Sequence, residues 1–181
     1  MKTLMISRRV SMLALLVIAA ACGGSSPASP SGGGGTSGGG GNASACPAMY
    51  VNKGTMNARI DGTAWTTTCV NPTYGGGQLN IVGDNLANPA TIISFVLGPV
   101  SGPGIYSITP LGVPAQVVVT GHLAVGGSAI WDAYAGHGSG SVTINALTPT
   151  GASGTFSFMM PASSGTATGT RAVEGSFNAA F

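Results

Sequence analysis

Charged side chains are scarce in this 181-residue chain, in which Asp, Glu, Lys and Arg together make up 6% of the residues. Three of its basic residues lie within the first nine positions, and the remainder carries more acidic than basic side chains. Proteins bind nucleic acids through Lys and Arg side chains that neutralise phosphates. The composition therefore excludes a nucleic-acid partner, and it offers no charged face that would attract ionic substrates.

Long apolar runs are also rare. The run at residues 10–21 has about a dozen residues, too short for a helix to cross a hydrocarbon core ~30 Å thick. It follows Lys2, Arg8 and Arg9 and ends in three alanines, an arrangement typical of a secretory signal peptide. We therefore assign residues 1–21 to a signal peptide, and we expect no membrane-spanning helix after it.

The sequence IAAAC at residues 18–22 resembles the lipobox of bacterial lipoproteins. The resemblance implies cleavage before Cys22 and attachment of a diacylglycerol, with palmitate-like chains, to its sulfur. Two or more acyl chains anchor a protein stably, at ~0.8 kcal/mol per buried CH₂. The alternative is an ordinary signal peptide followed by a chance cysteine.

Residues 23–45 contain almost nothing that could pack in a core, being composed of Gly, Ser, Thr, Pro and Ala with one Asn. Such a composition cannot offset the entropy lost on ordering, so we expect a flexible linker. Residues 22–45 would then tether one folded domain, 46–181, to the membrane. The residue directly after Cys22 is Gly23. An aspartate at this position would resemble an inner-membrane retention signal, so the glycine favours anchoring in the outer membrane, on its periplasmic or surface face.

Cysteine is limited to three residues. With Cys22 lipidated, Cys46 and Cys69 remain, and in an oxidising envelope compartment such a pair predicts a disulfide. A metal site would need further ligands, and neither cysteine has a His or a second Cys close by in the sequence. We expect no metal and no cofactor.

Period-two alternation of apolar and polar residues dominates the rest of the chain. Residues 56–60 and 63–67 flank an Asp-Gly pair, which predicts a hairpin with a two-residue turn. Counting outward from that turn places Ala58 opposite Trp65 and Met56 opposite Thr67. Further strands are expected near residues 78–81, 92–97, 104–108, 116–125, 129–135, 141–146, 155–160 and 173–181. The sequence therefore predicts an all-β domain, an antiparallel sandwich or small barrel of about nine or ten strands.

Four stretches resemble those of an uncharacterised family of bacterial lipoproteins, known only as a domain of unknown function. They are ARIDGTAW at 58–65, GSGSVTI at 138–144, SGTFSF at 153–158 and GSFN at 175–178. The resemblance implies a small all-β domain on a lipid tether. It supplies no catalytic residues.

Motifs for catalysis are scarce. A Gly-x-Ser-x-Gly pattern occurs at 35–39, inside the expected linker, where the strand and helix that a hydrolase elbow needs are missing from the sequence pattern. The one set worth weighing combines Asp132 and His137 with Ser139 or Ser141, and His122 on a neighbouring strand. No oxyanion hole is apparent beside these residues, and solvated positions on a sheet face explain them. We expect no enzymatic activity.

Aromatic residues make up 6% of the chain. Trp131 and Tyr134 are the candidate ligand-binding pair, since the inward face of their strand is ambiguous. We therefore expect a membrane-anchored lipoprotein with a non-catalytic binding module for an unknown protein or glycan. The alternatives are a secreted hydrolase that uses the Asp132 and His137 region, and an integral outer-membrane β-barrel. The second is suggested by the terminal Phe181, although its strands would have to reach ~9–11 residues.

Overall fold

The structure is a computed structural model that describes residues 46, 50, 53–113 and 117–181. The signal peptide, Cys22 and the linker predicted for residues 22–45 lie outside the described residues. Among the residues that are described, no helix is long and apolar enough to cross a membrane.

The described chain folds into antiparallel β-strands, as the alternation predicts. The strands are β1 (Gly54–Ile60), β2 (Thr63–Thr67), β3 (Val70–Gly75), β4 (Gln78–Asp84), β5 (Thr91–Gly98), β6 (Gly104–Ser107), β7 (Val118–Val125), β8 (Ala129–Ala133), β9 (Ser139–Thr148), β10 (Gly151–Gly165) and β11 (Thr170–Ala180). Nine of them follow one another in the order β2-β1-β11-β10-β8-β7-β5-β4-β3, with β9 pairing to β10 and β6 to β9. The result is a nearly closed barrel, open only between β2 and β3.

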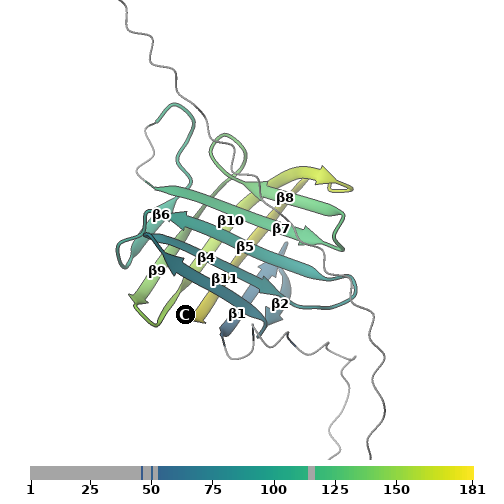
Figure 1. Ribbon diagram of the computed structural model, residues 1–181. Helices are drawn as coiled ribbons and strands as arrows, with labels where there is room; N and C mark the ends of the chain where they lie inside the picture. Colours follow the sequence, from purple (N-terminus) through teal and green to yellow (C-terminus); the bar gives the residue numbers. More distant parts are fainter. Residues whose placement is uncertain (1–45, 47–49, 51–52, 114–116) are drawn as a thin grey trace, which may run out of the picture. The chain divides into compact units, whose positions relative to one another are not determined.

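The barrel has two layers. Layer A contains β2, β1, β11, β10, β9 and β6, and layer B contains β3, β4, β5, β7, β8 and the end of β10. Strand β10 joins the layers because it is 15 residues long and its register shifts between Ala162 and Ser164. In Figure 1 the teal and green strands of layer B cross the yellow strands of layer A. Of the two predicted architectures, sandwich and small barrel, the structure has the barrel.

The first hairpin has the predicted register. Ala58 pairs with Trp65 and Met56 pairs with Thr67. Asp61 and Gly62 both have positive φ, 50° and 81°, as a two-residue turn that matches strand twist requires. Met56, Ala58 and Trp65 are buried, so the turn and the apolar pattern select the same register.

Phenylalanine rings fill the space between the layers. Phe95 of β5 lies 5.3 Å from Phe156, 6.4 Å from Phe158 and 5.2 Å from Phe177, measured between ring centroids. All four rings are at most 4% exposed. Aromatic pairs at these separations contribute about 0.5–1.5 kcal/mol each beyond their buried area.

Glycines inside the strands make room for these rings. Gly154 pairs with Phe177, and Gly175 pairs with Phe156. The two motifs Gly-Thr-Phe and Gly-Ser-Phe therefore face each other in antiparallel register, each ring lying over the other strand's glycine. A larger residue at either glycine would collide with the ring and with backbone atoms of the next strand.

The predicted disulfide is confirmed. Cys46 and Cys69 are bonded, with their Cα atoms 5.4 Å apart. Cys69 lies at the corner where the chain passes from β2 in layer A to β3 in layer B. The backbone N–H of Cys69 donates to Thr67 Oγ1 over 2.9 Å, and that hydroxyl donates to the Asp84 carbonyl over 2.6 Å. The disulfide thus ties the chain before β1 to the corner between β2 and β3.

Candidate functional site

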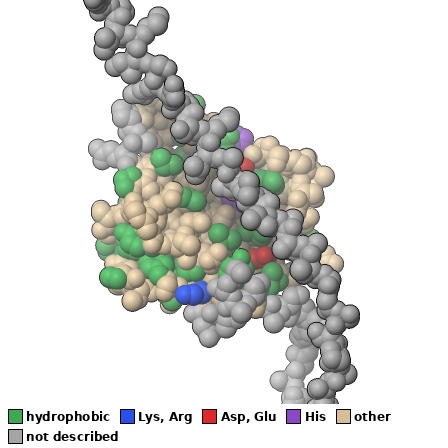
Figure 2. Space-filling view, viewed as in Figure 1, with side chains coloured by type: hydrophobic (Ala, Val, Ile, Leu, Met, Phe, Trp, Pro, Cys, Tyr) green, Lys and Arg blue, Asp and Glu red, His purple; other side chains and the backbone are tan. Residues whose placement is uncertain are grey.

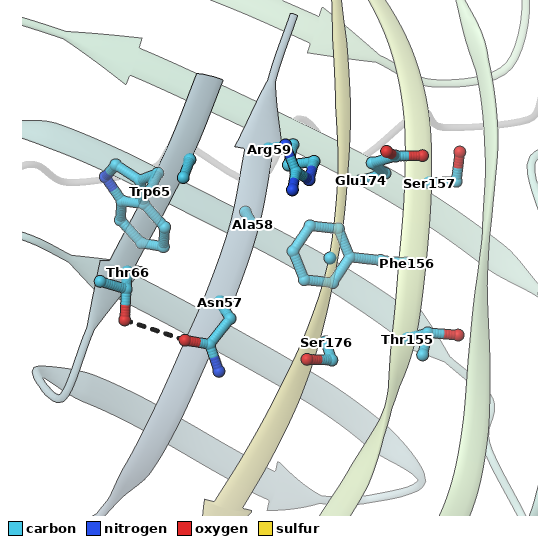
Figure 3. A pocket seen from close by; sticks show the side chains of 12 residues that line it. Asn57, Ala58, Arg59, Trp65, Thr66, Thr155, Phe156, Ser157, Glu174 and Ser176 are labelled. Carbon is cyan, nitrogen blue, oxygen red and sulfur yellow. Dashed lines mark hydrogen bonds between the residues drawn. The ribbon is translucent and has the colours of Figure 1, made fainter. Parts of the chain in front are cut away.

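The outer face of layer A carries a groove of about 690 Å³ that crosses β2, β1, β11 and β10 (Figure 3). Its walls come from alternate, outward-facing residues of these strands, and its floor is the backbone between them. It is lined by Asn57, Ala58, Arg59, Ala64, Trp65, Thr66, Thr155, Phe156, Ser157, Glu174, Gly175 and Ser176.

Small hydroxyl and amide side chains form one row across this groove. The pairing register places Thr66 beside Asn57, Asn57 beside Ser176, and Ser176 beside Thr155. Thr66 Oγ1 donates a 2.9 Å hydrogen bond to Asn57 Oδ1, drawn as a dashed line in Figure 3. Since the amide oxygen is occupied in this way, Asn57 presents its NH₂ group as a donor. The row therefore offers an amide donor and hydroxyl groups that can both donate and accept.

A second row carries the groove's only two charged lining residues. Arg59 pairs in register with Glu174, and Glu174 pairs with Ser157. Arg59 donates to the Gly62 carbonyl over 3.0 Å, which holds its guanidinium near the hairpin turn. The lining thus has one cation and one anion, and its net charge is close to zero.

A second cavity, of about 360 Å³, lies at the barrel end formed by the β1–β2 turn and the start of β11. We call it the end cavity. Its lining is mainly apolar and comes from both layers. The residues are Ile60, Asp61, Thr63, Ala64, Trp65, Thr91, Leu123, Val125, Trp131 and Arg171.

The charged groups of the end cavity are paired. Arg171 donates to Asp61 Oδ2 over 2.6 Å, and the backbone N–H of Ala172 donates to Asp61 Oδ1 over 2.8 Å. The hydrogen bond from Arg171, followed by that from Ala172, lowers the pKa of Asp61 from its usual 3.8. The Arg171 guanidinium also lies over the Trp131 ring, 5.0 Å from its centroid. Asp61 is therefore both the predicted turn residue and a link between the hairpin and β11.

The two aromatic residues predicted to bind a ligand have different environments. Trp131 faces inward from β8 and is 4% exposed, and its indole N–H donates to the Thr168 carbonyl over 3.1 Å. It takes part in the end cavity and not in an exposed platform. Tyr134 is 44% exposed and stacks on His137, with ring centroids 4.9 Å apart. The structure does not bring Trp131 and Tyr134 into one surface.

The Ser–His–Asp set considered from the sequence is arranged differently in the structure. Asp132 Oδ1 accepts a 2.6 Å hydrogen bond from His122 Nδ1, on the outer face of layer B. His137 instead sits in the turn after β8, where its backbone bonds with Tyr134. The register places Ser94 beside His122, but among the described residues no serine hydroxyl is hydrogen-bonded to either histidine. Ser139 and Ser141 belong to β9 in layer A.

Charge is spread thinly over the molecule. In Figure 2, basic, acidic and histidine side chains appear as isolated spots on the visible face, without a patch of either sign. Within the described ranges, no three His, Cys, Asp or Glu residues come close enough to hold a metal ion. No family model, no curated protein and no solved structure matches the chain. The resemblance of its strand motifs to the uncharacterised lipoprotein family therefore stays a prediction.

Proposed function

We propose that this chain is a lipid-anchored protein of the bacterial envelope whose β-barrel domain binds a glycan without acting on it chemically. The groove across layer A is the binding face. The observation that carries the proposal is the row of hydroxyl and amide groups in that groove, from Thr66 through Asn57 and Ser176 to Thr155.

The anchor is proposed on the sequence alone. A basic segment, a short apolar run and the IAAAC sequence at 18–22 support lipidation of Cys22. The linker at 23–45 would let the domain reach partners roughly 26 Å away, as a flexible chain of this length does. The Gly residue after Cys22 supports the outer membrane as the site of anchoring.

A glycan suits the groove for chemical reasons. Sugars present many hydroxyl groups in a row and few charges, which matches a lining of hydroxyls and amides with one cation and one anion. Such groups select by hydrogen bonds, each worth about 0.5–1.5 kcal/mol net. The groove also spans four strands, so several sugar units would be held at once. If the partner were a polypeptide instead, the parent would not pellet with the glycan in the experiment below.

The non-catalytic part of the proposal rests on the arrangement of the titratable groups. His122 and Asp132 are paired on layer B, on the other layer from the groove. The hydrolase alternative would need a nucleophile beside this pair and donors for a developing oxyanion. We expect His122→Ala, His137→Ala and Asp132→Asn to leave binding and stability nearly unchanged. A hydrolytic activity that disappears in His122→Ala or His137→Ala would overturn this part.

The integral outer-membrane alternative needs an apolar band facing lipid. The outward residues that line the groove are instead Ser, Thr, Asn, Arg and Glu, with Ala64 as the one apolar member. The interior is filled by Phe95, Phe156, Phe158 and Phe177. These features support a domain held outside the membrane by its lipid. Mild protease treatment of membranes should release the domain by cutting the linker, whereas an integral barrel would stay.

The binding face can be tested with two matched variants. Thr155→Trp fills the β10 end of the groove, and Thr73→Trp places the same bulk on the outer face of layer B, since both threonines are exposed on strands. The full chain, purified in detergent, is incubated with insoluble peptidoglycan sacculi and pelleted. We expect the parent and Thr73→Trp to pellet equally and Thr155→Trp to pellet at least tenfold less. Equal pelleting of the two variants, or no pelleting of the parent, would overturn the proposal.

A further inference from the structure

The end cavity adjoins the groove, with which it shares Ala64 and Trp65, but it has a different chemistry. It opens to solvent at the end of the barrel, and its lining comes from both layers, whereas the groove lies over the outer face of layer A. Most of its lining is aliphatic or aromatic, including both tryptophans of the chain, Trp65 and Trp131. Its volume of about 360 Å³ lies within the range of small-molecule sites, about 300–1,000 Å³, which occur often at the mouths of β-barrels.

We propose that the end cavity is a second binding site, for a small uncharged aromatic molecule. The claim that the ligand is uncharged comes from the Asp61–Arg171 pair. These are the only charged residues in the lining, and they neutralise each other at 2.6 Å. A charged ligand would be taken from water into this lining without a partner of its own, which is costly.

The preference for an aromatic ligand comes from the two indole rings. Trp65 is 8% and Trp131 4% exposed, so both rings are held by the core and would lose little freedom on binding. Leu123, which is fully buried, adds an aliphatic wall between the layers. Aromatic rings gain about 0.5–1.5 kcal/mol from such neighbours beyond the area they bury. Arg171, stacked over Trp131, keeps that ring in place.

The site can be tested with three probes of one shape and different charge. These are naphthalen-2-ylmethanol, 2-naphthoate and naphthalen-2-ylmethylamine, which are neutral, anionic and cationic at pH 7. The full chain contains two tryptophans, and both line the end cavity. Because Trp65 also lines the groove and Trp131 does not, the indole N–H signal of Trp131 in a ¹⁵N NMR spectrum reports on occupancy of the end cavity. We expect the alcohol to shift both indole signals with saturation, and the two charged probes to bind at least tenfold more weakly.

Two variants locate the probe. Thr63 is exposed at the cavity rim, so Thr63→Phe should obstruct the cavity and weaken the alcohol at least tenfold. Thr73→Phe, on the outer face of layer B, is the matched control and should bind as the parent does. If Thr63→Phe and Thr73→Phe bind equally well, the probe lies elsewhere and the proposal is wrong.

A third variant tests the charge argument directly. Asp61→Asn leaves Arg171 as a cation without its carboxylate partner. The affinity for 2-naphthoate should then rise at least tenfold relative to the alcohol, while the affinity for the amine stays weak. No shift of the indole signals by the alcohol, or an unchanged preference in Asp61→Asn, would overturn the proposal. Neither result bears on the groove, which Thr155→Trp tests separately.

Discussion

Gly175 of β11 lies directly opposite Phe156 of β10, and the phenyl ring occupies the place where a side chain at residue 175 would begin. A Cβ built on Gly175 would meet Phe156 Cζ at 2.7 Å and would also meet the Asn57 carbonyl oxygen. Gly154 has the same relationship to Phe177. These reciprocal pairs let layer A carry large rings inward while its outer face, which forms the groove, stays smooth.

Gly175→Ala should destabilise the domain by about 1–3 kcal/mol, the usual cost of overpacking a filled core. Gly75→Ala is the matched control, because a Cβ there meets nothing within 4 Å. It should be neutral or stabilising by a few tenths of a kcal/mol, since Ala restricts the unfolded chain. Urea unfolding of both variants measures the difference. Equal urea midpoints for the two variants would show that Phe156 and its neighbours move aside for a Cβ at residue 175 at little cost in free energy.

Reduction of the Cys46–Cys69 disulfide should lower the free energy of unfolding by about 3 kcal/mol, as expected for a closed loop of this size. The physical reason is that the bond closes a loop of the unfolded chain, residues 46–69, which contains β1 and β2. Thiol titration of unreduced protein from the cell envelope should find neither cysteine reactive. Two reactive thiols there would contradict the disulfide in the mature protein.

Asp61→Asn should reduce stability at neutral pH and have no effect in strong acid. The folded-state pKa of Asp61 is lowered by Arg171 and Ala172, so its contribution is present above the unfolded-state pKa and is lost as pH falls through the folded-state value. The size is about 1 kcal/mol or less, because the pair is partly exposed and screened. Asn tolerates the positive φ of this position, so the turn is preserved.

Urea unfolding of the parent and Asp61→Asn at several pH values between 2 and 7 checks this prediction. The difference in unfolding free energy should shrink steadily as the pH is lowered past about 4. A difference that is constant across this range would show that the carboxylate's charge contributes nothing and that the Ala172 hydrogen bond acts alone.

Cys22→Ser should abolish lipid attachment and leave the chain unprocessed or released from the membrane. The reason is that the sulfur is the atom to which the diacylglycerol would be joined. Metabolic labelling with an alkyne fatty acid, followed by detection of the tagged chain, measures attachment. Continued labelling of the Cys22→Ser chain would refute the lipobox interpretation.

The sequence predicts those parts of the fold that depend on contacts between residues close together in the chain. The β1–β2 register follows from the Asp61-Gly62 turn and the alternation on either side, so it could be counted outward residue by residue. The Cys46–Cys69 pair followed from the number of cysteines. The number of strands was harder to predict, because short strands such as β6 (four residues) and β3 show little alternation of apolar and polar residues.

The candidate sites could not be predicted in the same way, because they depend on long-range register. Asp61 meets Arg171, which is 110 residues away in the chain. Asp132 pairs with His122 because the β7–β8 turn has three residues, Val125 pairing with Ala129. The sequence shows Gly126-Gly127 but not the length of that turn. The inward direction of Trp131 follows from the same register, so its burial was ambiguous from the strand alone.

The groove was missed because Ser and Thr on a sheet's outer face are ordinary. Only the order of β2, β1, β11 and β10 brings Thr66, Asn57, Ser176 and Thr155 into one row. Strands β1 and β11 are more than 100 residues apart, and nothing in either segment indicates that they pair.

The most direct test of glycan binding is a map of the bound surface. The ¹⁵N-labelled full chain is titrated with a soluble peptidoglycan fragment, and amide shifts are followed by NMR. The account predicts saturable shifts concentrated at the groove residues of β1, β2, β10 and β11, with Asn57 and Ser176 among the largest, and loss of those shifts in Thr155→Trp. Shifts centred on the outer face of layer B around His122 and Asp132, or no shifts at all, would contradict it.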